Sequence, residues 1–280
     1  MPFIAIVGCG PLGGALAHTL AGRDRVAEVR LIDPAGNVAQ GKALDIQQAG
    51  PVEQFCARLT HAGSWGAVAG AEVIVFADDG ATGREHAGEP GLSVLREVVK
   101  SAGSAPLVFA GASQRELMAR AAVELKVSRR RLIGSAPLAL ESAVRALAGV
   151  LLDTSGVDIA LRIVGVPPHA AVVAWEEGTA SALPLSSQLA AHQIAALNGK
   201  LRTLWPPGPY ALASAATRVV EGLLGRSRRR FSCFVALERG PLREAVVAMP
   251  IEVGLEGVRR VLEPKLTRQE QTLLENAIDL

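Results

Sequence analysis

Residues 8–13, with the sequence Gly-Cys-Gly-Pro-Leu-Gly, decide the fold, because they join an apolar run at 3–7 to a helical pattern. Glycines at this spacing allow a tight turn, a close approach of the backbone to a pyrophosphate, and close packing of the helix on the strand. The helix then offers unpaired N–H groups and the positive end of its dipole to the phosphates. The sequence therefore predicts a dinucleotide site at this turn.

An acidic residue follows at the expected distance. Asp33 lies 20 residues after the last glycine, at the end of a second apolar run at 29–32. There its carboxylate can accept the ribose hydroxyls, and it would repel a 2′-phosphate, so NAD is favoured over NADP. The predicted cofactor-binding residues are Gly8, Gly10, Pro11, Leu12, Gly13 and Asp33.

Strand and helix patterns alternate through the first half of the chain. Buried-strand runs at 73–77 and 107–110 flank a helical pattern at 92–99. This βαβ succession is typical of an α/β fold with a Rossmann-type, doubly wound parallel sheet. Its ligand is expected at the carboxyl ends of the strands, where the strand order reverses.

From about residue 135 the pattern changes. A long apolar helix pattern at 138–152 comes first, and the runs 231–237 and 245–253 look like an antiparallel pair. We predict an NAD-binding Rossmann domain at 1–134 and a mixed α+β C-terminal domain at 135–280. No low-complexity linker separates them, so the two halves are expected to share an interface.

Composition excludes several classes of function. The 280 residues carry 29 basic and 27 acidic side chains, so no strong field points to nucleic acid or to an anionic membrane. The basic runs 129–131 and 228–230 are interpreted as solvated turns before strands. The three cysteines have no metal-ligand spacing and indicate reduced thiols. We expect a cytoplasmic protein with no signal peptide, membrane span, metal or nucleic-acid partner.

Four further stretches occur in a recognisable order: 33–46, 172–175 with Leu183-Pro184-Leu185, 210–215, and 266–274. Through them the chain resembles the lactate/malate dehydrogenase family over nearly its whole length. The resemblance implies that family's fold, NAD(H) as cofactor and a small 2-oxo or 2-hydroxy acid as substrate. It also implies a homodimer or homotetramer, because Gln40–Ile46 resembles the helix through which the family pairs its subunits.

The resemblance fails where the chemistry should be. Reducing a 2-oxo acid needs a proton donor at the carbonyl oxygen, with a pKa near the working pH. The family places a histidine for this in a Gly-Glu-His-Gly-Asp loop, which here reads Gly-Val-Pro-Pro-His at 165–169. Pro167 therefore falls at the histidine position and has no proton to give, while His169 falls at the family's aspartate.

The family's Leu-Asp-x-x-Arg motif is altered as well. Its aspartate orients the histidine, and its arginine binds the substrate carboxylate with a planar pair of donors. The matching residues are Glu141 and Val144. Arg145 comes one position later, which rotates it by about 100° on a helix. Each principal catalytic position that the resemblance identifies is therefore changed.

Positions on the family's mobile loop and after its fifth strand differ too. If 89–92 is matched to the family's Lys-Pro-Gly-Met, its two arginine positions become Gly88 and Val94, with Arg84 and Arg96 in other registers. The family's asparagine before a proline matches about Ala112.

Two hypotheses follow. In the first, the protein binds NAD without the family's 2-hydroxy acid dehydrogenase activity, as a cofactor sensor or as part of an assembly. In the alternative, it is an active NAD-dependent oxidoreductase that uses His169 as acid/base, Glu141 as its orienting carboxylate, and Arg145 or Arg84 for the substrate.

Asp78 and Asp79 bear on how tightly NAD would bind. They end a predicted strand at the cofactor edge. Two carboxylates there would repel a pyrophosphate unless they point away.

Overall fold

The first half of the chain forms a parallel sheet in the computed structural model, which describes residues 3–225, 230–239 and 243–278. The strand order β3-β2-β1-β4-β5-β6 is the doubly wound order, so the predicted fold class is confirmed. The order reverses between β1 and β4, which pair directly. The strands are β1 (Ile4–Val7), β2 (Glu28–Ile32), β3 (Arg58–Ala62), β4 (Val73–Phe76), β5 (Leu107–Phe109) and β6 (Leu132–Gly134).

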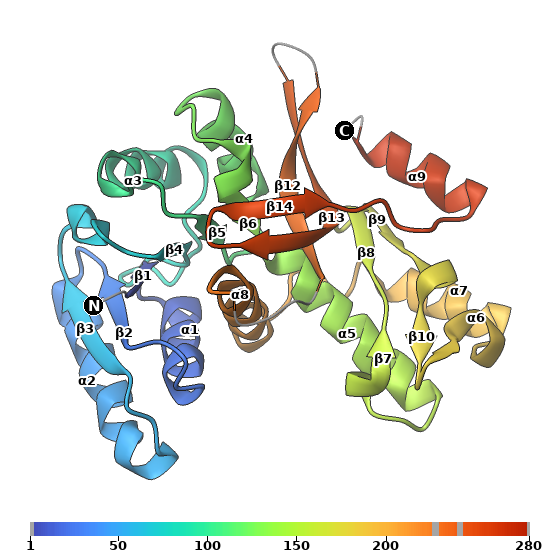
Figure 1. Ribbon diagram of the computed structural model, residues 1–280, viewed down its shortest axis with the longest axis horizontal. Coiled ribbons are helices and arrows are strands. Elements are labelled where there is room, and N and C mark those ends of the chain that lie inside the picture. The colour runs from blue at the N-terminus through green and yellow to red at the C-terminus, as the bar shows by residue number, and fades with distance from the viewer. Residues whose placement is uncertain (1–2, 226–229, 240–242, 279–280) are drawn as a thin grey trace.

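Helices cover both faces of this sheet, so its central strands are apolar throughout rather than alternating. In the view of Figure 1, α3 and α4 lie above the sheet, and α1 and α8 (Pro209–Leu223) lie below it. Helix α1 begins at Pro11, where the absent N–H removes one of the orphan donors of a helix start. The helices of this half are α1 (Pro11–Gly22), α2 (Gly36–Glu53), α3 (Gly88–Ser101) and α4 (Arg115–Val123).

The sheet continues into the second half with antiparallel strands. β12 pairs with β6 through Phe234 opposite Gly134, and then with β13 along its length, as the sequence predicted for these two runs. A separate small sheet has the order β11-β10-β7. The strands are β7 (Ile159–Ala160), β8 (Ile163–Val166), β9 (Ala170–Val173), β10 (Thr179–Ala180), β11 (Leu183–Pro184), β12 (Phe231–Arg239), β13 (Arg243–Gly254) and β14 (Gly257–Val261).

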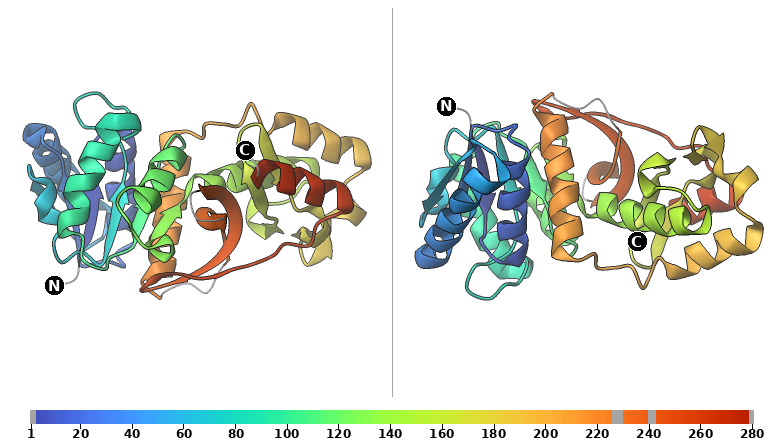
Figure 2. Two further views of the ribbon diagram at one scale, coloured as in Figure 1. Left: turned by 90° about the horizontal axis from the view of Figure 1, so that it is seen from above. Right: turned by 90° about the horizontal axis from the view of Figure 1, so that it is seen from below.

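Helix α8 joins the two halves. It comes from the second half of the chain yet packs against α1, and both views of Figure 2 show it standing between the halves. The carboxylate of its buried Glu221 pairs with Arg218 at 2.9 Å and with Arg23, just after α1, at 3.4 Å. The predicted boundary at 134/135 falls between β6 and α5, and the main hydrophobic core extends across it. The helices of this half are α5 (Ala136–Leu151), α6 (Leu185–Gln188), α7 (Ala191–Lys200), α8 (Pro209–Leu223) and α9 (Arg268–Ile278).

Several surface features concern the predicted partners. Within the described residues, none of the helices is long and apolar enough to cross a membrane, and no group of three or more acidic, His or Cys side chains is placed to hold a metal ion. Arg129 of the first basic run pairs with Glu238, and Arg131 donates to the carbonyl oxygen of Ala105. Of the second run, residues 228 and 229 lie outside the described part of the chain.

Candidate functional site

The candidate site lies outside the carboxyl ends of β1 and β4, at the reversal of the strand order, where this fold places its ligands. We call this region the crevice. Gly8 has φ +97°, in the left-handed region that favours glycine. A Cβ on Gly13 would collide with the carbonyl oxygen of Gly8, so this glycine allows α1 to pack closely on β1. The turn 8–13 thus has the tight backbone and the close packing of helix on strand that its glycine spacing predicted.

The N–H groups at the start of α1 are taken by a carboxylate of the chain itself. Asp78 Oδ2 accepts from the amide of Leu12 and Oδ1 accepts from that of Gly13, both at 2.8 Å. A Cβ on Gly10 would lie 2.5 Å from Cγ of Asp78. Burial raises the pKa of Asp78, while these two amides and the Lys42 ammonium act in the opposite direction. Asp78 therefore lies where the turn was predicted to hold a pyrophosphate.

Asp33 is equally engaged by the backbone. Its Oδ2 accepts from the amides of Cys9, at 2.9 Å, and Gly80, at 2.8 Å, and its Oδ1 accepts from the amide of Ala35 at 2.8 Å. The side chain is buried. A carboxylate offers about four lone-pair sites, and three of them serve the protein's own N–H groups. About one lone-pair site is left for the ribose hydroxyls, so a second hydroxyl could reach Asp33 only by displacing one of these N–H donors, such as that of Gly80.

One segment, residues 78–86, supplies both the Asp78 carboxylate at the start of α1 and the Gly80 amide at Asp33. We call it the 78–86 hairpin. Its ends meet in a β-bridge between Asp78 and Glu85, and the amide of Asp79 donates to the carbonyl oxygen of Arg84 at 2.8 Å. The carboxylate of Asp79 accepts from the amides of Ala81 and Thr82 inside the hairpin. Of the two aspartates at the end of β4, Asp79 therefore closes its own turn and Asp78 enters the crevice.

Glu85 fixes the other end of the hairpin to the turn after β5. Its Oε1 accepts from the amide of Ala112 at 2.9 Å, and its Oε2 accepts from that of Ser113 at 2.7 Å. A Cβ on Gly111 would lie 2.5 Å from Cδ of Glu85. A second carboxylate is thus bound by backbone amides of the same crevice.

Three other side chains complete the electrostatics of the crevice. Lys42 Nζ donates to the carbonyl oxygen of Gly10 at 2.6 Å. Burial, with the charge of Asp33, raises the pKa of Cys9 to about 12, so Cys9 is a neutral thiol. Burial lowers the pKa of His86. Its Nε2 has no hydrogen-bond partner in the described part of the chain, and its ring packs against that of Trp65 at an interplanar angle of 88°.

In the second half, Glu141 is completely buried and holds three elements together. Its Oε2 accepts from Ser232 Oγ of β12 at 2.6 Å, and its Oε1 lies 3.4 Å from Arg162 Nη1. Ser232 Oγ in turn accepts from the amide of Ile163 in β8 at 3.0 Å. Burial raises the pKa of Glu141, and Arg162 and Ser232 only partly oppose this.

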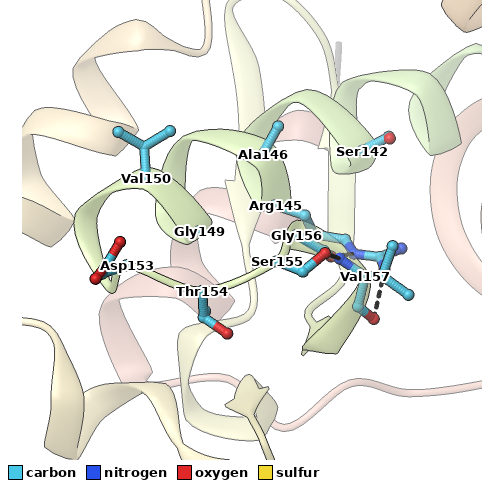
Figure 3. A pocket seen from close by; sticks show the side chains of 10 residues that line it. All are labelled: Ser142, Arg145, Ala146, Gly149, Val150, Asp153, Thr154, Ser155, Gly156 and Val157. Carbon is cyan, nitrogen blue, oxygen red and sulfur yellow. Dashed lines mark hydrogen bonds between the residues drawn. The ribbon is translucent and has the colours of Figure 1, made fainter.

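Arg145 lies on the outer side of α5, with its guanidinium held by a loop. Its Nε donates to the carbonyl oxygen of Gly156 at 3.1 Å, and its Nη2 to that of Val157 at 3.3 Å. Its Nη1 comes within 3.8 Å of Glu141 Oε1. Figure 3 shows it among residues that line an open cavity of about 780 Å³ between α5 and the loop that follows.

His169 is not brought together with these two residues. It is exposed in the turn between β8 and β9, and has no hydrogen bond or ion pair with any of the described residues. Pro167, at the position that the resemblance gives to the histidine, is buried in the same turn, and Val144 packs in the core beneath α5.

The two arginines considered for the substrate lie on other surfaces. Arg84 is exposed on the 78–86 hairpin. Arg96 lies on α3 at 3.9 Å from Glu124.

The sequence pointed to Asp78 through its charge. It gave no sign that Glu85 binds the amides after β5 or that Lys42 binds the carbonyl oxygen of Gly10. Asp78 bonds to residues 65 and 66 positions earlier, and Glu85 to residues 27 and 28 positions later. The sequence offered one signal, a carboxylate just after a central strand. Such a carboxylate can repel a phosphate, and it can also bind the amides that a phosphate would use.

Comparison with known proteins gives a consistent family of relatives, although no family model matches the chain. Malate dehydrogenases of Thermomicrobium roseum and Roseiflexus castenholzii are 26% and 25% identical to it, over 98% and 99% of this chain and 94% and 96% of theirs. Among solved structures, malate dehydrogenase from Salinibacter ruber has a TM-score of 0.85 at 20% identity, covering 99% of this chain and 94% of its own. Lactate dehydrogenase from Cryptosporidium parvum, complexed with lactic acid and nicotinamide adenine dinucleotide, has a TM-score of 0.84 at 22% identity, covering 99% and 95%.

Proposed function

We propose that this chain, a homologue of the lactate/malate dehydrogenase family, does not carry out NAD-dependent oxidation of 2-hydroxy acids. The observation that carries the proposal is the environment of Glu141. Its carboxylate is sealed between Ser232 and Arg162, whereas His169, the proton donor it was predicted to orient, is exposed and not bonded to it. General acid catalysis is typically worth about 10²- to 10⁴-fold, and this arrangement does not supply it.

Binding of a substrate carboxylate is also unsupported at the expected positions. Val144, where the family has its arginine, is an apolar core residue. The guanidinium of Arg145 donates to two backbone carbonyl oxygens instead of presenting a free pair of donors. The alternative, an active oxidoreductase built on His169, Glu141 and Arg145, therefore has less support.

Binding of a cofactor would depend on residues other than the catalytic candidates. The glycine turn, the start of α1 and Asp33 are the parts that NAD would use. In this structure they do not fit NAD, because Asp78 takes the α1 amides and Gly80 takes a lone pair of Asp33. The predicted binding of NAD(H) would therefore require these contacts to be replaced.

The predicted role in an assembly has one structural support. Helix α2 contains Gln40–Ile46, and its outer side exposes Leu44 to 58% and Val52 to 84%. We propose a homodimer or homotetramer through this helix, because large apolar side chains exposed along one helix favour an interface. Light scattering should give a multiple of the 29.1 kDa chain mass, and Leu44→Asp should reduce it. A wild-type protein that is monomeric at 50 μM would contradict this part.

The catalytic proposal is tested by following NADH at 340 nm with malate, lactate, oxaloacetate and pyruvate. We expect no turnover above the buffer rate with wild type or with His169→Ala. His192→Ala, which removes another exposed histidine on α7, is the matched control. Turnover that is present in wild type and in His192→Ala but lost in His169→Ala would overturn the proposal in favour of the oxidoreductase.

A further inference from the structure

We infer that the 78–86 hairpin is the resident occupant of the dinucleotide crevice, so that a pyrophosphate ligand binds only when the hairpin has left. This inference concerns binding alone and does not depend on whether the protein is catalytic.

A carboxylate of the chain lies at the start of α1, where this fold offers its amides to a phosphate. The amides of Leu12 and Gly13 point to a single position at the positive end of α1, and both carboxylate oxygens of Asp78 occupy it. Hydrogen bonds between an ionised acceptor and backbone amides are about twice as strong as neutral ones. A phosphate would need the same two donors and would be repelled by the aspartate.

The hairpin also fills the space beside the glycines of the crevice. Glycines open a crevice for close approach of a ligand, but here the room beside them is filled by the chain. A Cβ on Gly8 would meet the carbonyl oxygen of Asp78 and would lie 2.8 Å from Nε2 of His86. The spaces beside Gly10 and Gly111 are filled by the carboxylates of Asp78 and Glu85. Glycines on two different turns therefore open onto the same hairpin.

The hairpin is held to the rest of the protein at both of its ends. The carboxylates of Asp78 and Glu85 each accept two hydrogen bonds from backbone amides and so fix its two ends. Between them, Asp33 accepts from the amide of Gly80. The residues of its tip, 81–84, are exposed. His86 is buried, with 6% of the residue exposed, and its Nε2 lies beside Gly8 with no hydrogen-bond partner among the described residues. A buried polar atom without a hydrogen bond costs free energy that solvent or a ligand would recover.

Asp78 is therefore the residue that excludes a dinucleotide. Changing it to asparagine keeps its shape and removes its charge, and changing it to alanine frees the amides of Leu12 and Gly13. Removing the resident anion frees two amides for the ligand and removes a repulsive charge, so it should raise the affinity for a pyrophosphate ligand at least about tenfold.

The experiment is a calorimetric titration of ADP-ribose and of NADH into wild type, Asp78→Asn and Asp78→Ala. ADP-ribose tests the pyrophosphate position without the nicotinamide. Glu72→Ala is the matched control, because it removes an exposed carboxylate just before β4 that has no side-chain partner among the described residues. Circular dichroism of each variant verifies that it is folded. If Asp78→Ala does not fold, Glu85→Gln releases the other end of the hairpin and takes its place.

We expect no detectable binding to wild type or Glu72→Ala at 1 mM ligand, and binding to the Asp78 variants. Hydrogen exchange should then show loss of amide protection in 78–86 when ADP-ribose is added to Asp78→Asn. Micromolar binding to wild type with unchanged protection of 78–86 would overturn the inference. Asp78 variants that bind no better than wild type, or an equal gain in Glu72→Ala, would also overturn it.

The same variants separate this inference from the proposed function. Restored binding without turnover of 2-hydroxy acids supports both. Restored binding with turnover supports the role of the hairpin and overturns the catalytic proposal.

Discussion

Two buried glutamates show how differently the protein treats one kind of charge. Burial opposes the charge of Glu28, but hydrogen bonds from Arg30, Arg58 and Thr60 outweigh it, so the pKa of Glu28 is lowered. For Glu141 burial dominates, and its pKa is raised despite Arg162 and Ser232. The charged form is thus favoured by folding at Glu28 and disfavoured at Glu141.

These shifts predict opposite pH dependences of stability. A lowered folded-state pKa contributes stability above the unfolded pKa, ordinarily about 4.5, and loses it as pH falls. A carboxyl group whose pKa is raised by folding stabilises the protein at low pH, and this contribution is lost as the pH rises through the pKa of the folded state. Urea unfolding between pH 7 and 4 should therefore show that the advantage of wild type over Glu28→Gln shrinks as pH falls. Its advantage over Glu141→Gln should grow, and parallel slopes for the two variants would contradict the assignment.

At the scale of elements, the glycine turn and the 78–86 hairpin are in close contact. A methyl group on Gly10 would lie 2.5 Å from Cγ of Asp78. Gly13 packs on Gly8 behind the turn, and Glu85 holds the hairpin in front, so a small local shift of either segment would not make room for a methyl group on Gly10.

We predict that Gly10→Ala destabilises the protein by about 1–3 kcal/mol, the usual cost of overpacking. In an Asp78→Gly background most of this cost should disappear, because the colliding carboxylate is gone. The double-mutant cycle is measured by urea unfolding. Gly63→Ala, at an exposed loop position after β3 where a Cβ meets nothing within 4 Å, is the control. Equal costs of Gly10→Ala in both backgrounds would exclude the proposed contact.

The elements also show what the sequence could and could not predict. The turn 8–13 and strands β1, β4 and β5 were predictable because glycine spacing and apolar runs are local signals. The edge strand β3, with the sequence Arg-Leu-Thr-His-Ala, was missed because it has no such run. The position of Asp78 depends on residues more than 60 positions away, and that of Glu141 on Ser232, 91 positions away. Such pairings are decided by the tertiary fold and leave no local pattern.

At the scale of the whole molecule, the two halves are joined by α8 as well as by the continuous sheet. The buried Glu221 lies where α8 meets the end of α1, with the guanidinium groups of Arg23, Arg25 and Arg218 around it. We therefore expect the halves to unfold together.

Glu221→Gln should lower the free energy of unfolding by about 1–2 kcal/mol, since it removes charge-assisted hydrogen bonds to partly exposed arginines. The transition should remain single, with circular dichroism and tryptophan fluorescence coinciding. Glu256→Gln, at an exposed position after β13, should change stability by less than about 0.5 kcal/mol. Separate transitions in wild type would show that the halves are independent.

The exposed tip of the 78–86 hairpin has a practical consequence for protein engineering. The chain crosses there from β4 to the helix before β5, yet β4 and β5 are held together by their own parallel pairing. Exposed loop tips between well-paired elements are where chains tolerate new ends and inserted sequences. Residues 81–84 are therefore a suitable place to split this chain into two complementing fragments, or to insert a reporter whose signal depends on the state of the crevice.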